Sequence, residues 1–543
     1  MSRPCSEAAH DAAAPSRRPM SDVFDYVIAG AGSAGCVLAN RLSAAGQSVA
    51  LLEAGPRDDD PAIRVPAMVA RAIANPRQSW GYRTVPQAHV DDRVLPVPRG
   101  RVLGGCSSIN GMVYFRGHPR EYDEWRQPGW GYTDLLPYFL RLENYPAAHT
   151  PERRRGGPVN VIDIPKPNPL VRRFLAAADT LGLPRCPDFN GGDPEGFGPR
   201  QASIRNGRRE SGVTAYIDPA RGRPHLKIET DALVTRILFE GRRAAGVEIE
   251  RDGTRRQVRA RREVIIACGV YGSPQLLQLS GVGDAAALRA LGVAPLLDLP
   301  EVGQNLQDHP AASIAVRTSN TESYGLSWRT LPRSALIAAQ YLLSRSGPLA
   351  SNVFEANGFM RSRPQLERPD LQIIFMPAHR NANGHWLPRG HGYGIIFVNV
   401  RPASRGSVRL ISNDPHDRPA IDFNFLAAPG DMDVLVRGFE VARAILSAPS
   451  FAPLEGRETS PGPQVRERAE IEAHIRGSLV TVHHACGTCR MGDVVDASLR
   501  VKGIDALRVV DASVIPTVIA GNSNIPVVAV AERAADLLLE REP

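Results

Sequence analysis

The sequence predicts an α/β protein in which a Rossmann-like nucleotide-binding domain is built from both ends of the chain, with an α+β domain inserted between them. A strand, a glycine-rich turn, a helix and a second strand follow one another in residues 24–55. Strand-like and helix-like apolar patterns return in residues 506–540. The long region between is richer in strand-like runs, so we expect the inserted domain to carry a mainly antiparallel sheet.

The amino-terminal unit is the clearest local signal. The apolar run FDYVIAG (24–30) is typical of a buried strand, and AGCVLANRLSAAG (34–46) has helical spacing up to the glycine at its end, a common helix stop. QSVALLEAG (47–55) predicts the second strand. Together these segments form a βαβ unit of about 30 residues.

The middle of the chain alternates between irregular and regular segments. Residues 56–130 are rich in Pro, Gly and aromatic residues, and a long irregular excursion of this kind is usually functional. Residues 224–270 predict several strands, and residues 273–281 a helix. We predict a pair of joined strands in 392–412 that turn at Ser404-Arg405-Gly406. Further helices are predicted at 330–345, 431–447 and 527–540.

Composition narrows the class of protein. The chain has 543 residues, 43% of them apolar and 22% charged, which fits a globular protein rather than a disordered one. The net charge of +8 comes almost entirely from arginines scattered among acids, so we expect a solvated basic surface and no nucleic-acid partner; a functional anion site is the alternative. Seven cysteines, an odd number in a large chain, imply no disulfide framework.

Targeting signals are weak. The first 21 residues have no apolar core of a secretory signal, and we expect them to be a disordered tail. No apolar stretch approaches the roughly 18 residues that span a bilayer. We therefore expect a cytoplasmic protein; association with the cytoplasmic side of a membrane and the oligomeric state stay open.

The glycine motif predicts a dinucleotide site. Gly30 allows a tight turn, Gly32 lets a pyrophosphate approach the backbone, and Gly35 lets the helix pack against the strand. Ser33 opens the helix, whose free N–H groups favour phosphate. Glu53, about 20 residues further on, can accept hydrogen bonds from ribose hydroxyls and argues against a 2′-phosphate. FAD and NAD both stay open on this motif alone.

Longer motifs resemble one family. PRGRVLGGCSSINGMVYFRGH (98–118) closely resembles the first signature of the glucose-methanol-choline (GMC) family of FAD oxidoreductases. GVYGSPQLLQLSGVG (269–283) resembles the second, with Val where Ala is more usual. LPEVGQNLQDHP (299–310) and residues 508–536 are also similar. The likeness runs from about residue 22 to 537 and is strongest to bacterial choline-dehydrogenase-like and alcohol-dehydrogenase-like members.

This resemblance implies FAD as the cofactor. Ile109 stands where some relatives carry a His that bonds covalently to the flavin, so we expect non-covalent FAD. On its local pattern alone, Val234 is interpreted as an ordinary strand residue, and only the resemblance assigns it to FAD. The expected FAD contacts are Gly30, Gly32, Ser33, Gly35 and Glu53, Trp80 near the adenosine, Leu103, Gly105, Asn110, Met112 and Val113 near the isoalloxazine, Val234 at the adenine, and Asp511 and Ala512 at the pyrophosphate and ribitol.

The resemblance also implies domain boundaries. We expect the Rossmann-like FAD-binding domain to comprise residues 22–165, 206–310 and 471–543. The substrate-binding domain is expected to comprise residues 166–205 and 311–470.

Residues 483–492, HHACGTCRMG, could be a metal half-site, a redox dithiol or the edge of an active site. Zinc typically needs four ligands, and no second C-x-x-C or H-x₃₋₅-H lies in reach, so we predict no metal. A dithiol would need a C-x-x-C at a helix N-terminus in a small domain of its own. We expect Cys486 and Cys489 to be small buried residues that shape the loop.

In the family the catalytic base is the His of H-x-x-G-T, here His484, and its polar partner matches Asn522. If the segment is locally extended, His483 and His484 point to opposite sides, which makes His483 a substrate-side or packing residue. His309 is expected to be structural and Asn524 to order its loop.

The family chemistry implies oxidation of a primary alcohol to an aldehyde. His484 would take the hydroxyl proton, Asn522 would hold the oxygen, and hydride would pass to flavin N5, with oxygen or a quinone as final acceptor. Glu355 could face the quaternary ammonium of choline or be a structural acid paired with an arginine. With only 6% aromatic residues and no evident aromatic cage, we favour an aliphatic or aromatic alcohol over choline. A hydroxynitrile lyase on the same scaffold is the alternative of another class.

Overall fold

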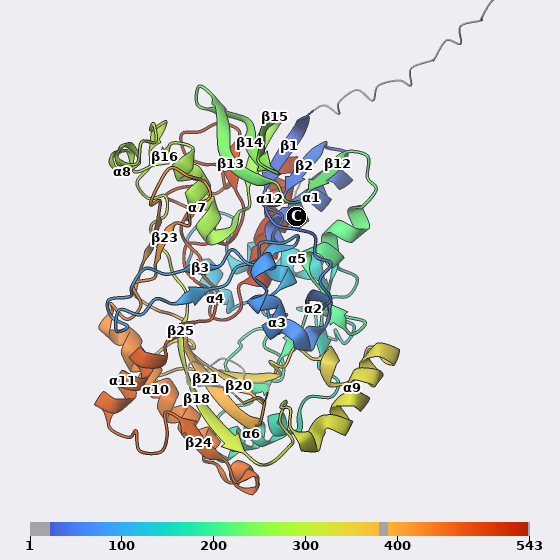
Figure 1. Ribbon diagram of the computed structural model, residues 1–543, viewed down its shortest axis with the longest axis vertical. Helices are drawn as coiled ribbons and strands as arrows, with labels where there is room; N and C mark the ends of the chain where they lie inside the picture. Colours follow the sequence, from blue (N-terminus) through green and yellow to red (C-terminus); the bar gives the residue numbers. More distant parts are fainter. Residues whose placement is uncertain (1–21, 380–388, 541–543) are drawn as a thin grey trace, which may run out of the picture.

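The computed structural model describes residues 22–379 and 389–540; the predicted tail, residues 1–21, lies outside them. Two large sheets dominate the architecture, one in the upper and one in the lower half of Figure 1. The upper sheet is mixed and the lower is antiparallel. The predicted α/β class, with an inserted region that carries an antiparallel sheet, is confirmed.

The upper sheet has a parallel core with an antiparallel extension. Its strand order is β12-β2-β1-β15-β14-β13, with β26 also on β15. Val27 in β1 lies opposite Ala50 in β2 and Val264 in β15, and all three are fully buried, as expected for a parallel strand covered on both faces. The strands are β1 (Val23–Ala29), β2 (Val49–Leu52), β12 (Leu226–Glu229), β13 (Leu233–Glu240), β14 (Arg243–Arg251), β15 (Thr254–Ile266) and β26 (Leu507–Val509).

Helices from the two ends of the chain close this sheet. α1 (Ser33–Ala44) packs against α12 (Asn524–Leu539), and α5 (Tyr132–Leu142) packs on α12 (Figure 1). Arg41 of α1 forms ion pairs with Glu532 and Asp536 of α12, whose side chains are 2% exposed. The carboxyl-terminal helix is therefore part of the nucleotide-binding fold.

The lower sheet is antiparallel throughout. Its order is β24-β18-β21-β20-β19-β8, with β25 on β18, and α10 (Pro429–Leu446) covers one face. The strands are β8 (Gly196–Pro199), β18 (Pro310–Thr318), β19 (Ala356–Met360), β20 (Leu371–Met376), β21 (His391–Asn399), β24 (Arg457–Ser460) and β25 (Val480–Thr481).

The predicted pairing of strands within 392–412 is wrong. β18 and β20 pair with the two edges of β21, which is buried along its whole length, so no edge is left for residues 407–409. β22 (Ser407–Arg409) pairs instead with β23 (Ala420–Asp422). The chain turns away because Asp431, at the start of α10, accepts hydrogen bonds from Ala403 N at 2.8 Å and from Ser404 N at 3.0 Å.

The remaining strands are short, and the remaining helices range from 4 residues in α2 to 14 in α9. As expected, 56–130 is largely irregular, and none of the helices in the described residues is long and apolar enough to cross a membrane. The other helices are α2 (Pro61–Arg64), α3 (Val69–Ala74), α4 (Pro119–Asp123), α6 (Pro169–Thr180), α7 (Gly269–Leu279), α8 (Ala285–Ala290), α9 (Leu331–Ser344) and α11 (Arg468–Ser478). The other strands are β3 (Tyr82–Arg83), β4 (Pro96–Val97), β5 (Glu143–Asn144), β6 (Val159–Asn160), β7 (Ile162–Asp163), β9 (Gln201–Ala202), β10 (Ile204–Arg205), β11 (Arg208–Arg209), β16 (Val282–Gly283) and β17 (Leu297–Asp298).

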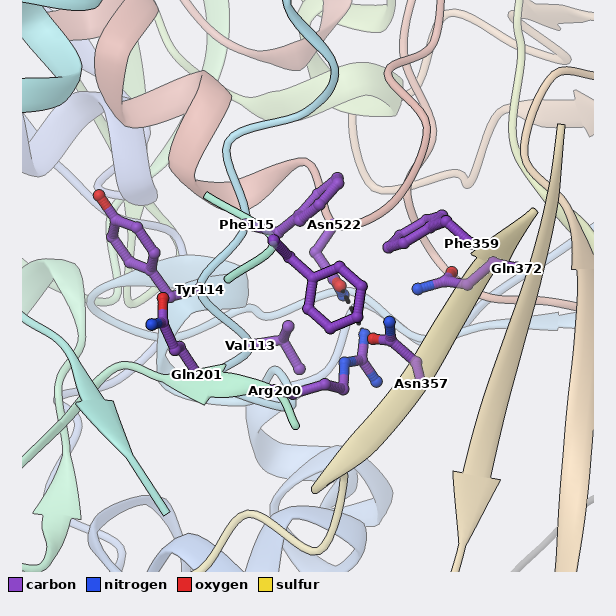
Figure 2. A pocket seen from close by; sticks show the side chains of 10 residues that line it. Val113, Tyr114, Phe115, Arg200, Gln201, Asn357, Phe359, Gln372 and Asn522 are labelled. Atoms are coloured by element: carbon purple, nitrogen blue, oxygen red, sulfur yellow. Dashed lines mark hydrogen bonds between the residues drawn. The ribbon is translucent and has the colours of Figure 1, made fainter. Parts of the chain in front are cut away.

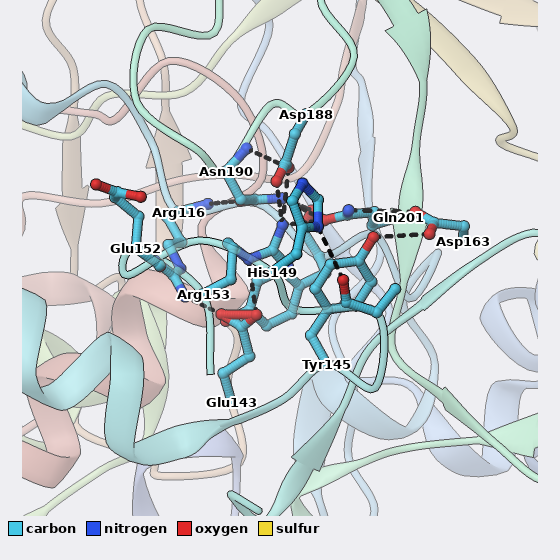
Figure 3. Close-up of polar contacts among 12 residues, drawn as sticks. Arg116, Glu143, Tyr145, His149, Glu152, Arg153, Asp163, Asp188, Asn190 and Gln201 are labelled. Carbon is cyan, nitrogen blue, oxygen red and sulfur yellow. Dashed lines mark hydrogen bonds and ion pairs between the residues drawn. The ribbon is translucent and has the colours of Figure 1, made fainter. Parts of the chain in front are cut away.

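A buried ionic network lies between α5 and β9 (Figure 3). Glu143, fully buried, pairs with Arg116 and accepts from Arg153 Nε at 2.7 Å. Arg153 also pairs with Asp188 at 2.6 Å and donates to Gln201 Oε1 at 3.0 Å. This network fixes β9, which directly follows Arg200.

Candidate active site

The glycine turn leaves room for a ligand at one position. A Cβ at Gly30 would lie 2.4 Å from Ala267 O, and one at Gly35 would lie 2.0 Å from Gly30 O, so both glycines are required by packing. A Cβ at Gly32 would meet only Ala267 O, at 4.0 Å. The protein therefore does not itself fill the space at Gly32, which fits the close approach of a pyrophosphate.

Glu53 directly follows β2 and is buried. Its carboxylate accepts from Ala31 N at 3.1 Å and from Gly55 N at 2.9 Å. Burial raises the pKa of Glu53 to about 7, although both backbone bonds lower it. Each oxygen retains a lone pair for a hydroxyl donor. Ala232 N bonds to Glu53 O at 2.9 Å, which places the start of β13, and with it Val234, beside this acid.

The turn of the first signature lies against the glycine turn. Gly104 N donates to Ala31 O at 2.8 Å, and a Cβ on Gly105 would lie 2.8 Å from Gly32 Cα. Leu103, just before it, is buried. Two motifs that are distant in the sequence thus form one surface.

Asn110 to Val113 form a loop held from two sides. Arg209 Nη1 donates to Asn110 O at 2.6 Å and to Asn110 Oδ1 at 3.0 Å, and the same Oδ1 accepts from Met112 N at 2.9 Å. Met112 has a φ of 55°, and Val113 pairs with Ala202. The loop is rigid enough to present a defined surface to a flat ring.

The remaining cofactor candidates lie at the edges of this region. Asp511 Oδ2 accepts from Gly269 N at 2.9 Å and from Ser273 Oγ at 2.5 Å, which ties the turn that contains Ala512 to α7. Ser33 Oγ donates to Asn524 Oδ1 at 2.7 Å, so the N-termini of α1 and α12 meet.

Arg101 links Trp80 to the chain that follows Glu53. The Arg101 guanidinium lies 5.4 Å from the Trp80 ring, and a Cβ on Gly55 would lie 2.0 Å from Arg101 O. The chain just beyond Glu53 is thus connected to Trp80. With these contacts in place, the residues present fit a dinucleotide.

His484 and Asn522 are brought together. Their Nε2 and Nδ2 atoms are 3.0 Å apart, and His484 Nδ1 lies 3.1 Å from His309 Nδ1. Because an amide nitrogen can only donate, Nε2 of His484 carries the lone pair and Nδ1–H donates to His309. Burial lowers the pKa of His484 well below its ordinary value, and His309, His483, Arg200 and Arg99 add to that effect. At neutral pH the imidazole is therefore an unprotonated acceptor.

Asp308 fixes the segment that carries the two histidines. Its carboxylate accepts from His484 N and from His309 N, both at 2.8 Å, and from the Thr481 hydroxyl. His483 has a φ of 70°, so the expected extended conformation does not hold at this residue. Its Nδ1 is buried without a partner, and burial, with Arg99 adding to it, lowers its pKa to about 3.

Three residues that contact this pair were not assigned to it from sequence. His309, expected to be structural, orients His484, and Asp308 positions both. Both belong to the LQDHP motif, which was available as a signal. Arg200 donates from Nη2 to Asn522 Oδ1 at 2.8 Å, and no motif pointed to it.

A small cavity opens on the Arg200 side of Asn522 (Figure 2). Val113 and Asn522 lie in its wall, so the cavity adjoins both the predicted isoalloxazine loop and the predicted catalytic pair. Its lining residues are Val113, Tyr114, Phe115, Phe189, Arg200, Gln201, Asn357, Phe359, Gln372 and Asn522.

Glu355 is occupied by hydrogen bonds. Its carboxylate accepts from Ser351 Oγ at 2.5 Å, from Tyr324 OH at 2.7 Å and from Asn168 N at 2.7 Å. In the part of the chain that the structure describes, no basic side chain forms an ion pair with it. Burial raises the pKa of Glu355, with these hydrogen bonds opposing the shift.

The cysteines of the C-x-x-C are buried free thiols. Cys486 is 1% exposed and Cys489 is fully buried, and desolvation raises the pKa of both. Among residues 22–379 and 389–540, no three His, Cys, Asp or Glu side chains are grouped to hold a metal ion.

The fold and this site define a dinucleotide-dependent oxidoreductase with a histidine–asparagine pair beside the cofactor region. Two family models, both described as GMC oxidoreductase, match residues 24–311 and 402–531. The chain belongs to the GMC oxidoreductase family and is an FAD-dependent oxidoreductase.

Similar proteins agree with this assignment. The chain is 41% identical to an alcohol dehydrogenase [acceptor] of Pseudomonas putida, over 96% of each chain. It is also 41% identical to an oxygen-dependent choline dehydrogenase of Vibrio vulnificus, again over 96% of each chain. Among solved structures, pyridoxine 4-oxidase from Mesorbium loti has a TM-score of 0.85 at 33% identity, covering 96% of this chain and 100% of its own. A formate oxidase of Aspergillus oryzae has a TM-score of 0.89 at 27% identity, covering 96% and 99%.

Proposed function

We propose that this protein oxidises a primary alcohol to an aldehyde, with His484 as the general base and Asn522 as the group that holds the alcohol oxygen. The observation that carries this proposal is the 3.0 Å contact between His484 Nε2 and Asn522 Nδ2. A hydroxyl that displaces this contact and binds to both atoms can give its proton to Nε2 and accept a hydrogen bond from Nδ2. Asn522 then stabilises the negative charge that develops on the oxygen.

His309 and Arg200 keep the pair in a productive arrangement. His309 accepts from Nδ1–H and so keeps the lone pair of His484 on Nε2. Arg200 binds the side-chain oxygen of Asn522 and so turns the NH₂ group of Asn522 toward His484. Such fixed polar groups need little reorganisation during reaction.

We further propose that FAD is held without a covalent bond. Ile109, at the position of the family's covalent histidine, has no nucleophilic atom and packs in a small apolar cluster with Ile63 and Val102. Bound FAD would supply the acceptor for the hydride that leaves the alcohol carbon. Oxygen or a quinone would then reoxidise it, and admitting air to the anaerobically reduced protein distinguishes these acceptors.

Choline, the substrate in the name of several relatives, is the second candidate. Glu355, which could face an ammonium group or be a structural acid, already accepts three hydrogen bonds. Arg200, a buried cation, lies one hydrogen bond from Asn522 and repels a quaternary ammonium at that side. These contacts favour an alcohol without a positive charge.

Substitution of the base tests the proposal. His484→Ala should retain FAD and lose about 10²- to 10⁴-fold in kcat/KM, the usual contribution of a positioned general base. His416→Ala, at an exposed histidine, is the matched control and should keep full activity. Near-normal turnover by His484→Ala would refute the assignment.

A flavin-dependent lyase predicts a different result. Anaerobic addition of an alcohol should bleach the flavin absorbance if the protein is an oxidoreductase of alcohols. Release of cyanide from a cyanohydrin without bleaching would instead indicate the hydroxynitrile lyase alternative.

A further inference from the structure

The small cavity beside Asn522 contains polar side chains without partners. Arg200, Asn357 and Gln372 are 3%, 2% and 0% exposed. Arg200 Nε, Asn357 Nδ2 and both polar atoms of the Gln372 amide are buried without a hydrogen-bond partner. Unpaired buried polar atoms cost about 1–3 kcal/mol each, so a cluster of them in one small cavity calls for a polar guest, either water or a polar group of a ligand.

The two amides are the polar side chains of β19 and β20. β19 and β20 are otherwise mostly apolar, and Asn357 and Phe359 share one face of β19 because side chains alternate along a strand. Phe359 lies directly opposite Gln372, which puts the second amide on the same face. Figure 2 shows Asn357 beside Arg200 and Gln372 beside Phe359. The face that carries Phe359 therefore holds two amides among apolar side chains.

The charge of this cavity is uncompensated. Among the described residues, no Asp or Glu lies within ion-pair distance of Arg200, and the guanidinium donates only to Asn522 Oδ1. Burial lowers the pKa of Arg200 to about 9, which still leaves it positive at neutral pH. A cation with two amides and no acid is suited to a ligand with anionic oxygen atoms.

The backbone holds Arg200 in place. Its N–H donates to Glu355 O at 2.9 Å, and Gln201, the next residue, accepts from Arg153 at 3.0 Å and from Asn190 at 2.9 Å. Tyr114 N also bonds to Gln201 O at 3.0 Å. The guanidinium is thus mounted on a rigid segment, as a recognition residue should be.

We propose that Arg200, Asn357 and Gln372 form a substrate subsite for a carboxylate, so that the preferred substrate is a short hydroxycarboxylate whose hydroxyl lies at His484 and Asn522. This inference rests on the proposed alcohol oxidation. Arg200 determines specificity, and the two amides complete the hydrogen bonds of the carboxylate.

The geometry limits the length of the substrate. Asn522 contacts His484 on one side and Arg200 on the other. Hydrogen bonds of about 2.9 Å on each side of that amide, together with the width of the amide itself, put the hydroxyl oxygen at most roughly 8 Å from Arg200 Nη2. A chain of about four carbons places a hydroxyl and a carboxylate within that range.

The test compares 4-hydroxybutanoate with 4-hydroxybutanamide, its uncharged isostere, on the FAD-loaded enzyme. Hydrogen bonds to charged groups contribute more than hydrogen bonds to neutral groups. The carboxylate should therefore have a kcat/KM about 10- to 100-fold higher than the amide. Calorimetric titration with butanoate and butanamide provides a binding readout that needs no turnover and should show the same preference.

Variants locate the effect. Arg200→Met should abolish the carboxylate preference and Arg200→Lys should retain part of it. Arg200→Met also removes a hydrogen bond to Asn522. Because Gln372 does not contact Asn522, Gln372→Leu should reduce the preference without removing that bond. Gln464→Leu, at an exposed glutamine, is the control and should keep the wild-type ratio.

The outcomes separate the two proposals. Equal kcat/KM for acid and amide in the wild type, as expected of a cavity filled only by water, would overturn the subsite while alcohol oxidation stands. A preference that survives in both Arg200→Met and Gln372→Leu would overturn it as well. If no alcohol of any kind reduces the flavin, the proposed function itself fails.

Discussion

Arg153 and Arg200 are both buried arginines, 5% and 3% exposed, yet their surroundings differ. Arg153 pairs with Glu143 and Asp188 and lies 4.1 Å from the Tyr145 ring (Figure 3). Arg200 has a single amide oxygen as side-chain partner and faces a cavity. The first arginine is compensated by the protein; the second is left for something that the protein does not itself provide.

This contrast distinguishes structural charge from recognition charge. A buried cation is expensive unless it is paired, so an unpaired one persists only where function requires it. The two sites are adjacent through Gln201, which belongs to the network, and its neighbour Arg200. The paired network therefore supports the unpaired group.

The largest expected effect is on stability. Arg153→Met leaves the acids Glu143 and Asp188 without one partner and should lower the free energy of unfolding by about 3–5 kcal/mol. Arg200→Met removes an unpaired charge and should cost less than about 1 kcal/mol. Urea unfolding of the FAD-saturated proteins measures both. Arg154→Met, at the exposed neighbour, is the control; equal losses at 153 and 200 would break the comparison.

A smaller change separates the parts of the Arg153 site. Tyr145 OH donates to Asp163 at 2.7 Å, and Asp163 is exposed to water. Tyr145→Phe keeps the ring beneath Arg153 and should cost about 1 kcal/mol or less. Tyr145→Leu removes the ring as well and should cost about 0.5–2 kcal/mol more. Identical unfolding midpoints for the two variants would show that the ring contributes nothing.

The smallest effect is on pH dependence. His484 is active when neutral, so activity is lost as pH falls through its pKa, which burial and positive neighbours place below 6.5. Arg200→Met removes one of these neighbours and should move the acid limb of kcat/KM to higher pH, by less than about one unit because burial is the larger cause. Profiles with an uncharged alcohol measure the shift. A limb that stays in place, or moves lower, would contradict it.

Much of the fold could be predicted from the sequence because its signals are local. The βαβ unit at residues 24–55 and α12 follow from apolar periodicity and glycine placement. The pairing within 392–412 could not be predicted, because β21 and β22 each pair with strands far away in the sequence. Which strands pair is decided by tertiary packing, and the local pattern does not encode it.

The candidate site divides in the same way. His484 and Asn522 could be found from motifs, as could the glycine turn. Arg200 could not, since one arginine among many carries no local mark, and its significance lies in which partners it lacks. The conformation of His483 could not be predicted from the sequence either. Its φ of 70° occurs in a segment that Asp308 holds through a hydrogen bond from His484 N.

The topology of the upper sheet has a consequence for the order of synthesis. β1 emerges from the ribosome early, whereas β26 and α12 emerge last. All seven strands of the lower sheet lie before β26 in the sequence. The lower sheet can therefore form on the nascent chain before β26 and α12, which complete the upper domain, have been made. The domain that begins first is therefore completed after the lower sheet, and cofactor loading is expected to wait until α12 has been made.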